Sequence, residues 1–339
     1  MATRYIRPFV QVGPGRPAQA LTLAGGWAWF THAEVLTRDA PARVVPVDAL
    51  EDAERTTLTA PRAPIAGLDW SAPRLMGILN VTPDSFSDGG QHLDGHATAH
   101  AGAMIDAGAD LIDVGGESTR PGAETVDPET ETQRTAPAIA AIRAEGRRTP
   151  ISIDTRKAGV ARAALEAGAN IINDVSGFTF DPELASLAAD TGTPVCVMHA
   201  QGDPATMQAD PRYDHVLLDV YDFLAARIDH LTGLGIPKAQ IIADPGIGFG
   251  KTADHNLALL ARLALFHSLG VPILLGASRK RFIGTLGHAP DPADRAPGSV
   301  GVALAAIAQG VQVIRAHDVA DHAQAIALWR ASVAHQTHD

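Results

Sequence analysis

The sequence has little cysteine, little positive charge and no long apolar run, and each shortage excludes a class of protein. Cysteine occurs once in the 339 residues, so neither an internal disulfide nor a zinc site built from several cysteines is possible. Cys196 lies in the apolar run Pro194–Met198. We therefore expect a buried thiol on a strand rather than a nucleophile.

Positive charge is scarce, because 27 Lys and Arg stand against 38 Asp and Glu, which gives a formal net charge of −11 with histidine neutral. This balance excludes a general nucleic-acid-binding protein, since nothing supplies the basic face that such binding needs. An anionic ligand would have to be held by a local cluster of cations and backbone N–H groups.

The longest apolar stretches are too short to cross a bilayer. Leu257–Phe266 is interrupted by Arg262, and Val302–Ile314 is interrupted by two glutamines. Both fall short of the roughly 18 to 20 apolar residues that a spanning helix needs. The N-terminal segment Met1–Pro8 is not followed by an apolar run of the secretory kind. We expect no membrane partner and a reducing, cytoplasmic location.

The chain divides into two parts of different character. Hydrophobic residues make up 46% and charged residues 19%, enough for a sizeable core. Residues 1–72 are rich in proline and alanine, and 56–73, with three prolines, predicts an extended connector. Short β-like runs occur at Tyr5–Val12, Ala20–Phe30 and Val44–Val47, and Gly25-Gly26 suits a hairpin turn. We expect a small, partly β N-terminal extension and linker, without visible chemistry.

Residues 73–339 show short β runs that alternate with alanine-rich stretches of helical period. Eight such units in about 265 residues match an α/β fold of the (β/α)8 TIM-barrel type. An open, doubly wound sheet is the alternative, but eight regular repeats favour closure. The expected strands are Leu75–Asn80, Leu111–Gly115, Ile151–Asp154, Ile171–Asp174, Val195–His199, Ile241–Asp244, Ile273–Gly276 and Val313–Ala316. The expected helices include Pro128–Glu145, Lys157–Ala167, Asp214–Leu234, Asp254–Leu269 and Val300–Gln309.

Polar residues gather where these strands end. The clusters are Asn80, Gly115 to Arg120, Asp154, Asn173 with Asp174, His199, Asp244, Ser278 to Lys280, and Arg315 with His317. A single residue of this kind is commonly a helix cap. Eight clusters in register are harder to explain in that way, and the carboxyl ends of barrel strands open on the face where active sites are built.

The residue types at these ends indicate what the site would bind. Asp154, Asn173 and Asp244 offer the donors and acceptors that pair with a planar, nitrogen-rich ring. Lys280, with Arg315 and His317, follows the seventh and eighth strands, where barrels often bind phosphate. We expect one cation of the run 279–281 to face the site.

Three other motifs each lack part of the pattern that they resemble. Gly246–Thr252 resembles a phosphate loop but has three residues, not four, before its Gly-Lys pair, and it is not a dinucleotide-binding fingerprint. His96 and His100 have helical spacing, but no third metal ligand is evident. Asp84 to Gly89 lacks the later glutamate of a calcium loop. We assign function to none of them.

Longer runs carry a resemblance to a known family. Met76–Gly90 (MGILNVTPDSFSDGG) and Ala109–Ala123 (ADLIDVGGESTRPGA) closely resemble the two signatures of dihydropteroate synthases. Six shorter segments follow in family order: Ser152–Thr155, Ile172–Asp174, Val197–His199, Asp244–Lys251, Gly276–Lys280 and Arg315–Val319. The resemblance covers about residues 74–332, and residues 1–72 lie outside it.

The resemblance implies a homodimeric barrel of folate biosynthesis, with Mg2+ as cofactor. It would join 6-hydroxymethyl-7,8-dihydropterin pyrophosphate to 4-aminobenzoate and release pyrophosphate and 7,8-dihydropteroate. By the family's pattern, Asp154, Lys280 and Arg315 would be catalytic, and Asn80 would hold the metal. The pterin would be held by Asp154, Asn173, Asp244 and Lys280, with Met198 also assigned to substrate binding. Thr119, Arg315 and His317 would surround the phosphates, and Phe86, Arg120, Pro121 and Ser278 would form the aminobenzoate side, where sulfonamides compete.

The chemistry of the residues agrees with this reaction. When pyrophosphate leaves, positive charge develops on a methylene attached to an electron-rich ring, so cations at the leaving oxygens and a carboxylate such as Asp154 near the ring both help. The aromatic amine needs positioning rather than a covalent nucleophile. Two alternatives remain: the pterin-binding barrel of a corrinoid-dependent methyltransferase, and a non-catalytic pterin-binding homologue. The first has no reason to keep both cation clusters, 278–280 and 315–317.

Overall fold

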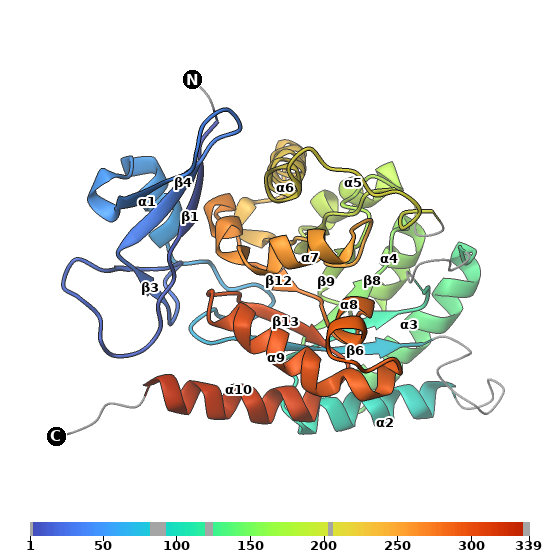
Figure 1. The fold of residues 1–339 in the computed structure, drawn as a ribbon. Coiled ribbons are helices and arrows are strands. Elements are labelled where there is room, and N and C mark those ends of the chain that lie inside the picture. Colours follow the sequence, from blue (N-terminus) through green and yellow to red (C-terminus); the bar gives the residue numbers. More distant parts are fainter. Residues whose placement is uncertain (1–2, 82–92, 119–124, 203–205, 335–339) are drawn as a thin grey trace.

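A computed structural model describes residues 3–81, 93–118, 125–202 and 206–334. Eight parallel strands form its central sheet, in the order β11-β10-β9-β8-β7-β6-β13-β12, and a parallel bridge from Ala243 to Ile273 joins the two ends of that order (Figure 1). The sheet is therefore a closed barrel, as predicted. The strands are β6 (Arg74–Asn80), β7 (Leu111–Gly115), β8 (Ile151–Asp154), β9 (Ile171–Asp174), β10 (Val195–Met198), β11 (Ile241–Asp244), β12 (Leu274–Leu275) and β13 (Val313–Ala316).

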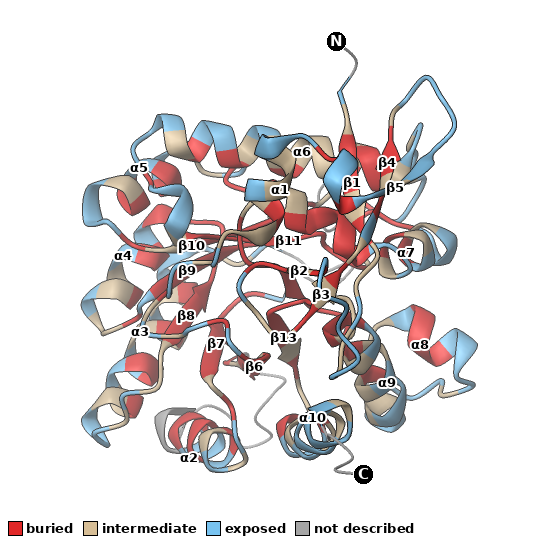
Figure 2. Ribbon diagram, turned by 90° about the vertical axis from the view of Figure 1, so that its left-hand side faces the viewer, coloured by how far each residue is buried: buried red, intermediate tan, exposed pale blue. Residues whose placement is uncertain are grey.

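Helices surround the barrel and bury their inward faces on it, while their outer faces are exposed (Figure 2). The α-helices of this layer are α2 (Leu93–Asp106), α3 (Pro128–Ala144), α4 (Ala158–Glu166), α5 (Pro182–Thr191), α6 (Val216–Gly233), α7 (Ala253–Leu260), α8 (Arg281–Leu286), α9 (Ala296–Ile307) and α10 (Val319–Ala334). Among the described residues, no helix combines the length and the apolar character needed to cross a bilayer.

The helix predicted over 254–269 is wrong in its second half. It is two pieces, α7 and the 3-10 helix η4 (Leu263–Leu269), with a break at Arg262. The side chain of Gln309 stabilises the break, because it donates to the Leu260 carbonyl at 2.8 Å and accepts from the Ala264 N–H at 3.3 Å. These bonds satisfy backbone groups that a continuous helix would have paired internally.

The strands are buried on both faces, which is usual for a parallel barrel inside a helical layer. Cys196 lies within β10 and is fully buried, so the expected strand thiol is confirmed. Burial raises the pKa of this thiol well above its ordinary value, which keeps it protonated and unreactive.

The N-terminal extension is a small β structure beside the barrel (Figure 1). An antiparallel sheet joins β1 (Tyr5–Pro8), β4 (His32–Leu36) and β5 (Arg43–Pro46), and the short pair β2 (Leu21–Thr22) and β3 (Trp29–Phe30) is connected through the expected glycine turn. Part of the predicted connector is instead helical, because α1 (Asp52–Thr59) extends into it. Glu51 and Glu54 form a capping box that starts this helix.

The extension is attached to the barrel by specific contacts. Tyr5 packs edge-on against Tyr221 of α6, with 5.3 Å between ring centroids, and its hydroxyl donates to Asp222 at 2.9 Å. Trp27 donates through its indole nitrogen to the Ile307 carbonyl of α9 at 3.2 Å. Ile65 and Trp70 pack in one cluster with residues from the amino-terminal halves of the barrel strands. The segment therefore covers the end of the barrel opposite the predicted site.

Candidate active site

The strand pairing brings the predicted site residues to one rim of the barrel. Asn80 pairs with Gly115, Gly115 pairs with Asp154, and Asp154 pairs with Asn173 on the next strand. Further round the barrel, Met198 pairs with Asp244. All of these residues except Asn80 are buried, and Asn80 is half-buried. These strand ends therefore form one continuous rim at the carboxyl end of the barrel, rather than a set of separate helix caps.

A carboxylate that the sequence analysis did not single out lies at the centre of this rim. Asp113, within β7, is fully buried and accepts from Arg315 Nε at 2.6 Å and from Asn173 Nδ2 at 3.1 Å. Ser152 also donates to it. The sequence pattern that predicted the site consists of residues at strand ends, and Asp113 is two residues before the end of β7. The sequence feature that could have identified Asp113 is the acidic residue between Ile112 and Val114, because a charge inside a buried strand needs a partner.

Arg315 links two strands through their carboxylates. Its guanidinium nitrogen Nη2 lies 2.9 Å from Asp154 Oδ2, in addition to the ion pair between Nε and Asp113. Burial raises the pKa of Asp154, and the neighbouring Asp113 carboxylate raises it further, while Arg315 opposes both. The ion pair with Arg315 favours the charged carboxylate, which can accept hydrogen bonds at the rim.

Lys280 and Asp244 form the second part of the rim. Lys280 immediately precedes α8, and its ammonium donates to the Ile247 carbonyl and lies 4.4 Å from the centroid of the Phe249 ring. Burial lowers the pKa of Lys280 to about 8, although Asp244 favours its charged form. Asp244 accepts from the Gly246 N–H at 2.7 Å. The loop after β11 therefore contacts both residues.

The three consecutive cations after β12 face different partners. Arg279 pairs with Asp318, with 3.0 Å from its Nε to Oδ2, and Arg281 is exposed on α8. Of these three residues, only Lys280 reaches the rim. It is therefore the cation of the run 279–281 that the sequence analysis expected to face the site. Ser278 Oγ lies 3.0 Å from His317 Nδ1 and accepts from the His317 N–H at 3.2 Å, so these two predicted residues are neighbours.

Four predicted residues, Phe86, Thr119, Arg120 and Pro121, lie outside the described residues. Asn80 ends β6 and offers an amide oxygen, a hard donor of the kind that Mg2+ accepts. Among the described residues, no group of three or more His, Cys, Asp or Glu side chains could hold a metal ion. A magnesium ion at Asn80 would therefore take most of its ligands from substrate phosphates and water, which is its usual mode of binding.

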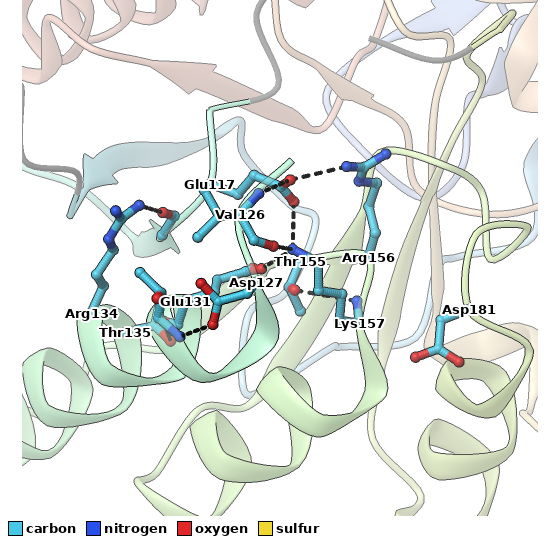
Figure 3. A network of polar contacts seen from close by, with 12 residues as sticks. Glu117, Val126, Asp127, Glu131, Arg134, Thr135, Thr155, Arg156, Lys157 and Asp181 are labelled. Carbon is cyan, nitrogen blue, oxygen red and sulfur yellow. Dashed lines mark hydrogen bonds and ion pairs between the residues drawn. The ribbon is translucent and has the colours of Figure 1, made fainter. Parts of the chain in front are cut away.

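A buried ionic network lies beside the rim at the start of α4 (Figure 3). Lys157 Nζ lies 3.0 Å from Glu117 and 2.5 Å from Glu131, and it donates to the Val126 carbonyl at 2.7 Å. Arg156 NH2 also lies 3.1 Å from Glu117. These contacts connect both described ends of the segment between β7 and α3 to the residues that follow Asp154.

Two cavities open next to the rim. One of about 850 Å3 is lined by residues that include His199, Gln201, Tyr213 and His255, and it lies outside the strands. The other, of about 190 Å3, is lined in part by Arg156, Phe180 and Phe249. Neither cavity is lined by the carboxylates that contact Arg315, so the chemistry of the rim rather than cavity size identifies the site.

Comparisons with known proteins agree with this geometry. The family described as pterin binding enzyme matches residues 76–317. Dihydropteroate synthase of Escherichia coli is 48% identical over 269 residues, which are 78% of this chain and 94% of the relative. The structure of Xanthomonas albilineans dihydropteroate synthase with 4-aminobenzoic acid is 44% identical, with a TM-score of 0.76 over 81% of this chain and 99% of that one.

A second solved structure, Yersinia pestis dihydropteroate synthase in a sulfonamide drug complex, is 45% identical, with a TM-score of 0.74 over 78% of this chain and 96% of that one. The family match covers most of the chain and includes every described residue of the rim. The chain therefore belongs to the pterin binding enzyme family and, within it, to the dihydropteroate synthases.

Proposed function

We propose that this chain joins 6-hydroxymethyl-7,8-dihydropterin pyrophosphate to 4-aminobenzoate, with release of pyrophosphate and 7,8-dihydropteroate. The observation that carries the proposal is the buried cluster in which Arg315 contacts Asp113 and Asp154 while Asn173 donates to Asp113. This cluster combines ring-binding carboxylates and an amide with a fixed cation at one rim. The family and the relatives reported above support the same reaction.

The pterin ring would lie against Asp154, Asn173, Asp244 and Lys280, with Met198 beneath it. Buried carboxylates accept from ring N–H and amino groups, and the lysine donates to the ring carbonyl or ring nitrogen. Because Asp154, Asn173 and Asp244 are buried, and Arg315 and the loop after β11 already orient the site, little reorganisation is needed when the ring binds.

The pyrophosphate would lie on the side of Arg315 and His317, with Thr119 as a further predicted contact. Asn80 would hold Mg2+ bound with the substrate, and the ion would supply positive charge at the leaving oxygens. Arg315 and His317 orient these oxygens, and His317 is itself held by Ser278.

The reaction exchanges one bond for another at the pterin methylene. The C–O bond to pyrophosphate breaks, the amine nitrogen of 4-aminobenzoate forms a C–N bond with the same carbon, and one amine proton is lost to solvent. Asp154 stabilises positive charge that develops on the ring as the C–O bond lengthens. Holding the amine near the methylene supplies the remaining acceleration, since a weakly basic aromatic amine needs orientation more than activation.

The aminobenzoate side would comprise Ser278 together with Phe86, Arg120 and Pro121. A sulfonamide has the same aromatic amine and an acidic group in the same place, so we propose that sulfonamides compete there. The sulfonamide complex of the Yersinia pestis relative supports this.

The decisive experiment measures pyrophosphate release by the purified chain with the pterin pyrophosphate and Mg2+, in the presence and absence of 4-aminobenzoate. We expect release to require 4-aminobenzoate and to fall when a sulfonamide is added. Pterin binding without release would indicate a non-catalytic homologue. Methyl transfer to a corrinoid would indicate the other alternative.

We also propose a homodimer in the cytoplasm. Leu328 of α10 is 67% exposed, so a large apolar side chain on the outer face of this helix is available for contact with a second copy. Sedimentation of the purified chain should give twice the monomer mass, and Leu328→Glu should shift the population toward monomer.

A further inference from the structure

One lysine that the proposed reaction does not use is buried directly beside the rim. Lys251 is 3% exposed and follows the loop 246–250, which connects β11 to α7. Its Nζ donates to the Gly246 carbonyl at 2.8 Å and to the Phe249 carbonyl at 3.0 Å, and it lies 2.8 Å from His199 Nδ1. The amino group is thus enclosed by the loop that precedes it.

These partners suit a lysine in either protonation state. Burial lowers the pKa of Lys251 well below its ordinary value. With two or three protons, Nζ can donate to both loop carbonyls, and His199 Nδ1 completes the set as acceptor or donor. The contacts therefore hold the loop whether or not the amine is charged.

The loop packs closely against the segment after β10 at two glycines. Gly246 and Gly250 have φ values of +68° and +62°, in the left-handed region. A Cβ at Gly246 would lie 1.8 Å from the His199 carbonyl oxygen, and one at Gly250 would lie 2.4 Å from that of Gln201. The loop is pressed against the segment after β10, and only glycine fits at these two positions.

The outer side of the same loop holds two residues assigned to the pterin. The Ile247 carbonyl accepts from Lys280, and the Phe249 ring lies under the same ammonium. The Gly246 N–H donates to Asp244. Displacing the loop would therefore move Lys280 and release a hydrogen bond from Asp244.

We infer that Lys251 is a positioning residue of the pterin site, which fixes the loop 246–250 from inside and thereby places Lys280 and Asp244. The inference rests on the proposed function, because it assigns the pterin to those two residues. Lys251 itself touches neither substrate in this arrangement.

Lys251→Met tests the inference, because methionine matches the unbranched stem of the lysine side chain but has no donor. We expect affinity for the pterin pyrophosphate, measured by calorimetry without 4-aminobenzoate, to fall by about 100-fold, which is the effect of losing one hydrogen bond to a charged group. The alkaline limb of kcat/KM should also move to higher pH.

The direction of the pH shift follows from the surroundings of Lys280. Asp244, Asp154 and Arg315 face its ammonium, and Lys251 lies on the far side of the loop. Burial is the main cause of the lowered pKa, about 8. Activity that needs the protonated amine is lost as pH rises through this value. A loosened loop admits water, which returns the pKa toward its ordinary value and moves the limb upward.

Arg62→Met is the matched control. Arg62 is also a cation that donates to backbone carbonyls, those of Thr57, Ala60 and His267, but it lies between the extension and η4, away from the rim. We expect it to lower stability while pterin affinity and the pH limb stay unchanged. If Lys251→Met lowers stability as Arg62→Met does and leaves affinity and limb unchanged, Lys251 is merely structural and the inference is wrong.

Tyr213→Phe keeps the test decisive if Lys251→Met does not fold. The Tyr213 hydroxyl donates to the Gly250 carbonyl at 2.7 Å, so its loss loosens the far end of the same loop. We expect a smaller fall in pterin affinity with the same direction of pH shift, and no change in either would overturn the inference. Wild-type chain that binds the pterin pyrophosphate without releasing pyrophosphate would refute the proposed synthase activity but leave this binding comparison valid.

Discussion

Two buried aspartates at neighbouring strand ends perform different tasks. Asp154 accepts from Arg315 at the rim, whereas Asp174 accepts from the N–H groups of Ser176 and Phe178 and from the Ser176 hydroxyl. Asp174 therefore holds the turn that follows β9. The position of both residues at strand ends could not distinguish these two roles. Neighbouring residues of a strand point to opposite faces of the sheet, so a shift of one residue reverses the direction of the side chain.

This difference predicts the outcome of two matched substitutions. Asp154→Asn should lower turnover by about 10²- to 10³-fold, the usual effect of losing one preorganised charge, with the fold intact. Asp174→Asn should keep turnover and lower the melting temperature, because it weakens a turn outside the site. Steady-state kinetics and thermal unfolding of both variants test this. Near-wild-type turnover in Asp154→Asn would remove that carboxylate from the mechanism.

His267 predicts a pH dependence of stability. It is fully buried in η4, its Nε2 lies 2.9 Å from the Gln309 carbonyl oxygen, and burial lowers its pKa to about 4. Between about pH 6.5 and 4, His267 is protonated in the unfolded chain but not in the folded chain. The contribution of His267 to the free energy of unfolding is therefore fully present above pH 6.5 and is lost as the pH falls toward 4. A shift of this size corresponds to roughly 3 kcal/mol.

The measurement is denaturant unfolding of wild type and His267→Gln at several pH values. We expect the variant to lose less stability than wild type between pH 6.5 and 4. His32→Gln, at an exposed position of β4, is the control and should follow wild type. Parallel curves for wild type and His267→Gln would contradict the prediction.

At the scale of elements, local pattern predicted most strands but not every helix. β7, β8, β9, β11 and β13 have the predicted bounds, because each is a short run of β-branched or aliphatic residues that ends at glycine, a polar residue or alanine. The break between α7 and η4 depends on Gln309, 45 residues further along the chain from Ala264. Asp113 was missed for a similar reason, since its main partner Arg315 is 202 residues away. Contacts between residues so far apart in the sequence produce no local periodic pattern from which they could be predicted.

The ionic network at the start of α4 gives a prediction for an element junction. Lys157→Met would leave Glu131 buried without a cation and Glu117 with Arg156 alone, which should lower the free energy of unfolding by about 3 to 5 kcal/mol. Denaturant unfolding measures this, with the exposed Lys238→Met as the control. A loss no greater than that of the control would mean that the junction tolerates the Glu131 carboxylate without a cation.

For the molecule as a whole, the extension packs on the barrel at the end opposite the rim. None of the described rim residues comes from it, yet Ile65 and Trp70 cover one end of the barrel and Tyr5 packs on α6. The sequence alone predicted an appendage without chemistry. It could not predict this attachment, because Tyr5 and Trp27 have partners 217 and 280 residues further along the chain.

Two deletions separate these roles. Removing residues 1–70 should give insoluble chain, because it uncovers the apolar barrel end that Trp70 closes. Removing residues 1–60 keeps Ile65 and Trp70, and any folded product should retain turnover comparable to the full chain. Solubility and pyrophosphate release measure both effects. A soluble, folded 1–60 deletion without activity would show that the extension contributes to the reaction.

The attachment of the extension also has a consequence for synthesis of the chain. The partners of Tyr5 and Trp27 are Asp222 and Ile307, which lie 217 and 280 residues further along. At roughly 5 to 20 residues per second, a ribosome needs on the order of 15 to 60 s to make the second of these partners. The segment that leaves the ribosome first is therefore among the last to reach its final place, and its apolar residues stay accessible to chaperones and proteases until the barrel is complete.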